Sequence, residues 1–122
     1  VQLPDCGLAD TGLVEQVELL DAVLNDGGSP VVIDSHLLLE DPAGVLERVC
    51  ERLGLKFDEA MLSWPAGPKP EDGVWAPAWY SSVHTSTGFS PYRPSSHPTP
   101  DRLGPILDEA LPLYERLLEF AL

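Results

Sequence analysis

Apolar residues recur at helical spacing near the start of the chain. They are separated by three or four positions, which places them on one face of a helix with 3.6 residues per turn; the stripe is Leu13, Val17, Leu20 and Leu24. Asp10 or Thr11 can cap the start of such a helix, and Gly27 can end it. The pattern therefore predicts a helix over residues 11–25.

A second helix is predicted over residues 41–53. Asp41 suits the N-cap position, and Pro42 suits the first helical position because its missing N–H has no partner there anyway. Gly54 fits the position after the last helical residue. A shorter pattern with Asp58 as its cap follows.

A long apolar pattern near the end of the chain predicts a helix over residues 99–120, with Thr99-Pro100 as its cap and first position. Pro105 and Pro112 lie inside this pattern. Because proline cannot donate the helical hydrogen bond, we expect a break or a kink there.

The run from Pro30 to Asp34 predicts the one strand of the chain. Val31, Val32 and Ile33 are β-branched and do not alternate with polar residues, which is typical of a parallel strand buried on both faces. Such a strand places Asp34 and Ser35 at its carboxyl end, where open α/β sheets bind ligands. These two residues are therefore candidates for the wall of a site.

A single strand cannot satisfy its own main-chain hydrogen bonds. We therefore expect residues 1–122 to be one partial domain of an α/β fold, mostly helical, with one short buried parallel strand. Its sheet would be completed by a missing N-terminal half or by another protein.

Residues 65–77 are rich in proline and glycine and predict a stiff loop, with a short helix over 78–85. Aromatic residues surround the loop: Trp64, Trp75, Trp79 and Tyr80. Each can bury a large apolar area while its polar tip makes a hydrogen bond. We expect them to anchor the loop, which would then form a wall of a site rather than its reactive centre.

Composition limits the partners. The chain has 122 residues and a net charge of −13, which disfavours nucleic acid and anionic membrane surfaces because both require a basic footprint. No apolar run is long enough for membrane insertion, and no signal peptide is visible. We expect a soluble intracellular protein, in the cytosol or an organelle. Because the chain begins at Val1, we expect a processed, excised or partial polypeptide.

Histidine is the main candidate for proton transfer, since its ordinary pKa lies near neutrality. His84 lies among serine and threonine hydroxyls, but no acidic residue close to it in sequence would orient it. We therefore predict no catalytic residue, and we place His84 with Asp34 and Ser35 among the candidates for a substrate contact or a site wall. His36 follows the predicted strand and suits a turn that starts a helix, and we expect His97 to be exposed. The histidines and the two cysteines, Cys6 and Cys50, lack the spacing of a zinc site or a disulfide framework, and Cys50 fits a buried apolar position.

Long segments of the chain resemble a known family. The segments are "VVIDSHLLLEDP", "VCERLG" and "MLSWPAGPKPEDGVWAPAWYSSVHTSTGF". They resemble the C-terminal half of sulfotransferase-like proteins of the P-loop NTPase superfamily. The branch is one found in bacteria and, in plants and algae, fused ahead of a domain resembling branched-chain aminotransferases. The resemblance implies a parallel sheet flanked by helices and, in a complete relative, the donor 3′-phosphoadenosine 5′-phosphosulfate.

In that family the donor lies on a Gly-rich loop that leads into a helix, where main-chain N–H groups hold the anion. The 122 residues contain no G-x-x-x-x-G-K-[ST] motif, and Gly27-Gly28 follows a helix instead of preceding one. The resemblance places "GPKPEDGVWAP" where a late loop closes over the nucleotide, and it implies Lys69 as a phosphate contact beside Trp75. Glu71 and Asp72 beside Lys69 would oppose that contact.

Three interpretations of function remain open. The first is a sulfotransferase-like portion that lacks the phosphosulfate-binding half and is inactive alone. The second is a non-catalytic structural or interaction subunit of a larger assembly. The third is a small hydrolase that uses His84.

Overall fold

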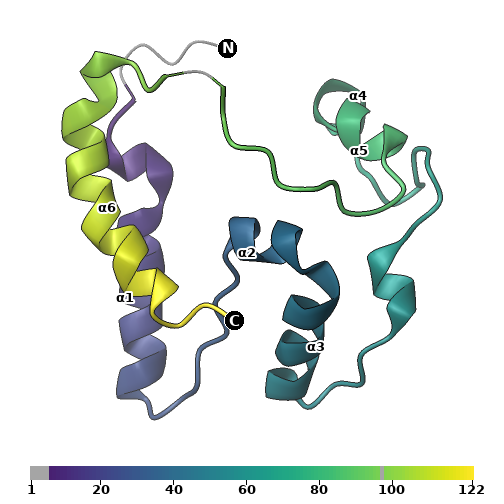
Figure 1. The fold of residues 1–122 in the computed structure, drawn as a ribbon, viewed down its shortest axis with the longest axis horizontal. Coiled ribbons are helices and arrows are strands. Elements are labelled where there is room, and N and C mark those ends of the chain that lie inside the picture. Colours follow the sequence, from purple (N-terminus) through teal and green to yellow (C-terminus); the bar gives the residue numbers. More distant parts are fainter. Residues whose placement is uncertain (1–5, 97) are drawn as a thin grey trace. The chain divides into compact units, whose positions relative to one another are not determined.

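The computed structural model describes residues 6–96 and 98–122, so His97 lies outside the described residues. The chain divides into two compact units. The first unit comprises the chain up to Asp34 together with residues from Arg93 onward, and the second comprises Ser35–Tyr92. Both units are built mainly from helices, as the sequence predicts (Figure 1).

Two long helices form the first unit. Helix α1 (Leu13–Asn25) packs against α6 (Gly104–Leu118), and each is preceded by a 3-10 turn, η1 (Leu8–Thr11) and η3 (Asp101–Leu103). The buried residues of these helices are apolar: Leu20, Ala110 and Leu117. The Nη2 atom of Arg116 donates to Oδ1 of Asp21 at 3.2 Å and thereby ties α6 to α1.

Helix α1 begins two residues later than predicted. Gly12 separates it from η1 with a φ of 69°, a left-handed conformation that favours glycine. The Asp10 side chain is used instead by η1, where Oδ2 accepts from the Gly7 N–H at 2.7 Å. The end of α1 follows the prediction, since Gly27 has a positive φ just after the last turn.

Helix α6 is shorter than the predicted 99–120 range. Pro105 lies in its first turn, where proline is tolerated, and Pro112 lies inside the helix, which continues through it. The expected break is therefore found at the start of the helix, where η3 precedes α6, and not at Pro112.

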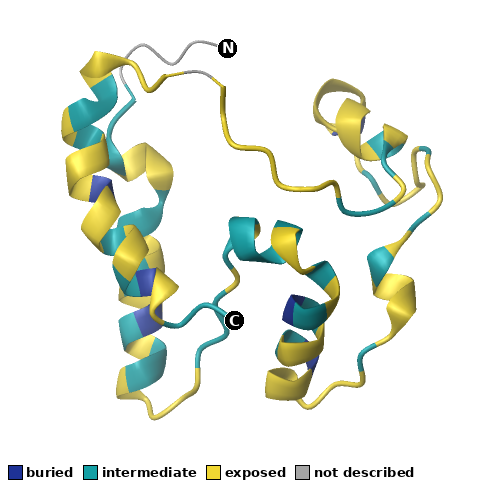
Figure 2. Ribbon diagram, in the orientation of Figure 1, coloured by how far each residue is buried: buried dark blue, intermediate teal, exposed yellow. Residues whose placement is uncertain are grey.

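The second unit begins with α2 (Ser35–Glu40) and α3 (Pro42–Leu53), which pack together. Helix α3 lies where the sequence predicts it. Oδ1 of Asp41 accepts from the Gly44 N–H at 3.0 Å, and Gly54 ends the helix with a φ of 67°. Val45 and Cys50 are buried on this helix (Figure 2).

The rest of the second unit consists of short pieces: η2 (Glu59–Leu62), α4 (Ala76–Trp79) and α5 (Ser81–Thr85). Helix α4 begins within the predicted 65–77 loop, and the predicted 78–85 helix is divided at Tyr80. Among the described residues, no helix combines the length and apolarity needed to cross a lipid bilayer.

The prediction of a regular strand over residues 30–34 is wrong. Within the described residues this segment forms only an isolated parallel bridge, between Val32 and Ala121. A regular strand requires a neighbouring strand with which it can form a ladder of main-chain hydrogen bonds, and the described residues do not provide one.

Candidate functional site

Residues 63–89 of the second unit form a closed loop, named here the 63–89 clamp. Ser63 and Gly88 form an antiparallel bridge, the Trp64 N–H donates to the Thr87 carbonyl at 3.1 Å, and the Gly67 N–H donates to the His84 carbonyl at 2.8 Å. A Cβ atom at Gly88 would lie 3.1 Å from the Leu62 carbonyl oxygen. The proline-rich loop is therefore held by main-chain contacts to α5 and to the segment that follows it.

Trp64 is the aromatic anchor of the clamp. Its Nε1 donates to Oγ of Ser86 at 2.9 Å, and that hydroxyl in turn donates to the Val83 carbonyl at 2.7 Å. The ring meets Phe89 edge-on with centroids 5.4 Å apart, an arrangement that aromatic pairs favour. The predicted anchoring role is thus confirmed for Trp64.

Asp72 and His84 form the polar centre of the clamp. His84 Nε2 lies 2.9 Å from Asp72 Oδ2, and both side chains are about four-fifths buried. The same oxygen accepts from the Lys69 N–H at 2.7 Å. The hydrogen bond from the Lys69 main chain and then the bond from His84 hold the pKa of the Asp72 carboxyl below its usual range.

This partner of His84 is not apparent from the sequence, which has no acidic residue close to His84. Asp72 is twelve positions away and is brought in by the closure of the loop. The sequence does indicate a turn at this point, since Asp72-Gly73 is a typical turn dipeptide and follows three prolines.

The geometry does not assemble the hydrolytic pair of the third interpretation. In the part of the chain that the structure describes, no serine or threonine hydroxyl forms a hydrogen bond with the His84 ring. Activation of a nucleophile by histidine requires that contact. Tyr80 lies beside the ring instead, edge-on at 6.1 Å between centroids.

The predicted site residues at the end of the Val31–Ile33 run are separated between the units. Asp34 belongs to the first unit, where its Oδ2 accepts from the Tyr114 hydroxyl at 2.9 Å. Ser35 begins α2. His36 is on α2, where its Nε2 lies 3.0 Å from Glu40 Oε1 and its ring stacks on Tyr92 at 3.8 Å.

Two of the predicted anchors are not anchors. Trp75 is 72% exposed and Trp79 is 68% exposed, and both lie at the ends of the four-residue helix α4 (Figure 2). So short a helix buries only Ala76. Residues 73–92 around it contain no Asp, Glu, Lys or Arg, so this segment itself adds no full charge beside the two exposed rings.

Comparison with known families decides the wider assignment. A family model described as "Sulfotransferase domain" matches residues 2–121. The chain belongs to the sulfotransferase domain family. The resemblance carried by the sequence motifs is thereby confirmed.

Two curated relatives carry the same type of domain. The chain is 44% identical over 110 residues to branched-chain-amino-acid aminotransferase-like protein 1 of Arabidopsis thaliana, and 40% identical over 108 residues to protein 2 of the same name. The matches cover 88% of this chain but only 20% and 19% of the relatives. The chain therefore spans about a fifth of their length, and no solved structure matches it.

An anion site of the P-loop type uses free main-chain N–H groups. The Lys69 N–H is bonded to the Asp72 carboxylate at 2.7 Å, so this group is not free to hold an anion. Trp75 lies on the same loop and presents an exposed ring. Of the five predicted site residues, the structure brings together Lys69 and His84, through their shared contact with Asp72.

Proposed function

We propose that the chain is the carboxyl-terminal part of a sulfotransferase-like domain and that its 63–89 clamp forms a wall beside the donor or acceptor. The observation that carries the proposal is the match of residues 2–121 to the sulfotransferase domain, in a chain that spans about a fifth of its relatives. The family's donor, 3′-phosphoadenosine 5′-phosphosulfate, supplies an activated sulfuryl group. On this proposal its binding loop belongs to another part of the polypeptide or to a partner.

The structure of the clamp supports the role of a wall. Its polar groups bond to one another: Asp72 joins the Lys69 main chain to His84, and Trp64 joins Ser86. Such internally satisfied groups hold a loop in one conformation but leave few donors for a ligand. The Lys69 ammonium is the exposed cation of this loop, and we propose it as a peripheral phosphate contact beside Trp75.

The proposal is tested by comparing the isolated 122-residue chain with the polypeptide in which it naturally occurs. We expect the isolated chain to show no saturable binding of 3′-phosphoadenosine 5′-phosphate by calorimetry. The complete polypeptide should bind it and should transfer sulfate. Tight binding by the isolated chain would show that the other part is not needed.

The contribution of Lys69 has its own control. In the complete polypeptide, Lys69→Ala should weaken nucleotide binding by roughly tenfold or more, because a hydrogen bond to a charged group contributes about 1.5–3 kcal/mol. Lys56→Ala removes the same charge from an exposed position outside the clamp and should leave the affinity unchanged. Equal effects of the two variants would remove Lys69 from the proposed contact.

A second candidate is a non-catalytic interaction subunit. It is favoured by the exposed side chains of Trp75 and Trp79 in a segment without charged residues, because exposed apolar side chains that gather in a patch are typical of interaction sites. Under this alternative the complete assembly binds no nucleotide, and substitution of both tryptophans by serine releases a partner. A folded chain that remains monomeric in its natural setting would argue against it.

A further inference from the structure

A hydroxyl residue followed by proline and, two residues later, by arginine occurs twice between residues 90 and 102. The first instance runs from Ser90 to Arg93 and the second from Thr99 to Arg102. Ser29 is also followed by proline, but valine takes the place of the arginine. A hydroxyl before proline is the acceptor that proline-directed protein kinases select, and kinases also read the charge of nearby residues. The structure distinguishes these three hydroxyls.

Ser90 lies in an exposed and irregular part of the chain. Residues 90–94 are all exposed, belong to no helix or strand, and form no hydrogen bond between main-chain atoms within the described residues (Figure 2). Pro91 and Pro94 keep the residue before each of them out of the helical conformation. Ser90 and Arg93 both hold such a position, so both favour the extended backbone that a kinase groove binds.

The groups that a kinase would contact are not used inside the fold. Among the described residues, the Ser90 hydroxyl and the Arg93 guanidinium form no hydrogen bond or ion pair. Tyr92 between them stacks on His36, with ring centroids 3.8 Å apart. This contact holds the middle of the segment while Ser90 and Arg93 remain exposed.

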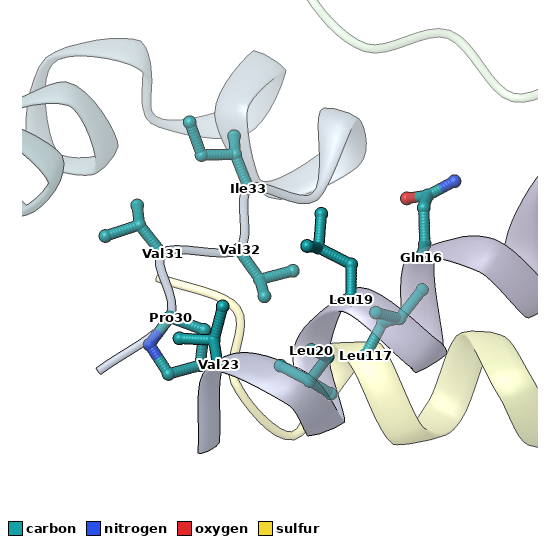
Figure 3. Close-up of a pocket in the computed structure, with 9 residues that line it drawn as sticks. All are labelled: Gln16, Leu19, Leu20, Val23, Pro30, Val31, Val32, Ile33 and Leu117. Atoms are coloured by element: carbon teal, nitrogen blue, oxygen red, sulfur yellow. The ribbon is translucent and has the colours of Figure 1, made fainter. Parts of the chain in front are cut away.

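Ser29 is not presented in this way. Pro30 and the three residues after it line an apolar pocket in the first unit (Figure 3). Val32 also pairs with Ala121, and its carbonyl accepts from the Leu122 N–H at 3.2 Å. The residues that follow Ser29 would have to leave this packing before a kinase groove could bind them.

Thr99 differs in the backbone that follows it. Pro100 precedes the 3-10 turn η3, and its carbonyl accepts from the Leu103 N–H at 2.9 Å. Arg102 is therefore part of a turn instead of an extended segment. Asp101 places an acidic group next to this arginine, which disfavours a groove that selects arginine by negative charge.

We propose that Ser90 is a phosphorylation site for a proline-directed protein kinase whose substrate groove carries an anionic site for Arg93. In the transfer, Oγ of Ser90 forms a bond to the γ-phosphorus of ATP, and the bond from that phosphorus to the β–γ bridging oxygen breaks. ADP leaves, and the hydroxyl proton passes to the catalytic aspartate of the kinase. The inference goes beyond the proposed function and does not depend on it.

Charge along the chain favours this site. Residues 73–100 contain no acidic residue, although the chain has twenty. No carboxylate of this segment therefore opposes an anionic substrate groove. A phosphate on Ser90 would add about 1.5–2 negative charges to the segment.

The test uses the 122-residue chain, magnesium ATP and a purified proline-directed kinase of the cyclin-dependent class. We expect one phosphoryl group per chain, located on Ser90 by fragmentation mass spectrometry. Peptides with the sequences of residues 86–96 and 95–105 provide the unfolded reference for Ser90 and Thr99. The ratio of the rate at Ser90 to the rate at Thr99 should be at least tenfold higher in the chain than in the peptides, because only the folded chain holds Arg102 in a turn.

Matched variants test the two recognition contacts. Pro91→Ala and Arg93→Gln should each lower the rate at Ser90 at least tenfold. Arg102→Gln removes the same charge from the second segment and should leave the rate at Ser90 unchanged. Ser90→Ala should remove the modification, and circular dichroism of each variant verifies that the chain remains folded.

The inference is overturned if the folded chain accepts phosphate faster at Ser29 or Thr99 than at Ser90, or not at all. Equal effects of the two arginine substitutions overturn it as well, and so does a rate ratio that is the same in the chain and in the peptides. Transfer to Ser90 that requires both the proline and the arginine supports the inference, whether or not the complete polypeptide transfers sulfate.

Discussion

Asp72 is the residue at which the polar contacts of the 63–89 clamp meet. One of its oxygens accepts from the Lys69 main chain and also contacts the His84 ring. Because the ionised carboxylate accepts these bonds better than the neutral acid, the pKa of Asp72 is lowered in the folded chain. The charge of this one residue therefore connects the proline-rich loop to α5.

The lowered pKa predicts a pH dependence. A carboxyl whose folded pKa is depressed stabilises the fold above its unfolded pKa, about 4, and this stabilisation is lost as the pH falls through the lower folded value. Asp72→Asn should therefore lower the urea midpoint near neutral pH. The difference from wild type should shrink below about pH 4. Urea titrations at several pH values measure it.

Glu71→Gln provides the control for this prediction, because it removes a neighbouring exposed carboxylate. It should shift the urea midpoint little at any pH. If the two substitutions give the same pH profile, the stabilising contact does not belong to Asp72.

At the residue scale, sequence reasoning succeeded where a side chain acts locally and failed where loop closure creates the contact. The role of Trp64 was predictable because a large aromatic between loops has few alternatives to packing. The Asp72–His84 pair depends on the path of residues 73–83, which no periodicity encodes. The exposure of Trp75 and Trp79 was missed because a helix of four residues offers little surface for packing.

Helix α3 is the element whose ends are defined most clearly. Gly54 ends it with a φ of 67°, a conformation that disfavours residues with a Cβ atom. Gly54→Ala should lower the stability of the second unit by about 1 kcal/mol. Thermal unfolding followed by circular dichroism measures the change.

Gly104 supplies the opposite case, since it begins α6 with a φ of −51° and has open space around its Cα. Gly104→Ala should raise stability by about 0.5–1 kcal/mol, because alanine loses less backbone freedom on folding. A Cβ atom at Gly54 would meet no atom within 4 Å, so unchanged stability in Gly54→Ala would show that its left-handed φ does not require glycine.

The start of α3 predicts a separate effect. Asp41→Ala removes the acceptor for the Gly44 N–H and should lower stability by about 1 kcal/mol. Asp41→Asn keeps an acceptor oxygen and should retain most of it. Chemical denaturation compares the three proteins, and equal losses in both variants would point to the charge of Asp41 instead of its hydrogen bond.

At the element scale, helices with clear capping residues could be predicted from the sequence, whereas the strand could not. Asp41, Pro42 and Gly54 specify α3 within a few residues of sequence. Val31–Ile33 has strand composition, but a strand exists only with a neighbour, and the described residues supply one bridge at Val32. β-branched composition is therefore not sufficient to form a regular strand at Val31–Ile33 in the described residues.

At the scale of the whole molecule, electrostatic repulsion is the main long-range interaction. The chain has twenty acidic and seven basic residues, and like charges in a compact chain repel one another. Raising ionic strength from about 0.01 M to about 0.15 M shortens the Debye length from about 30 Å to about 8 Å. The thermal midpoint should therefore rise with salt.

Scanning calorimetry in NaCl and in KCl tests this expectation, and the two salts should act alike if screening is the cause. A fall in the midpoint with added salt would show that ion pairs such as Arg116–Asp21 outweigh the general repulsion.

The first unit is assembled from the two ends of the chain, and this has a consequence for biosynthesis. The Arg116–Asp21 contact joins positions 95 residues apart, whereas the contacts of the second unit lie within Ser35–Tyr92. At roughly 5–20 residues per second on the ribosome, α1 waits about 5–20 s for α6 to be made. A released chain truncated after Leu103 should therefore resist protease across the second unit while α1 is still cut, so residues 35–92 are expected to fold without α6, whereas α1 needs it.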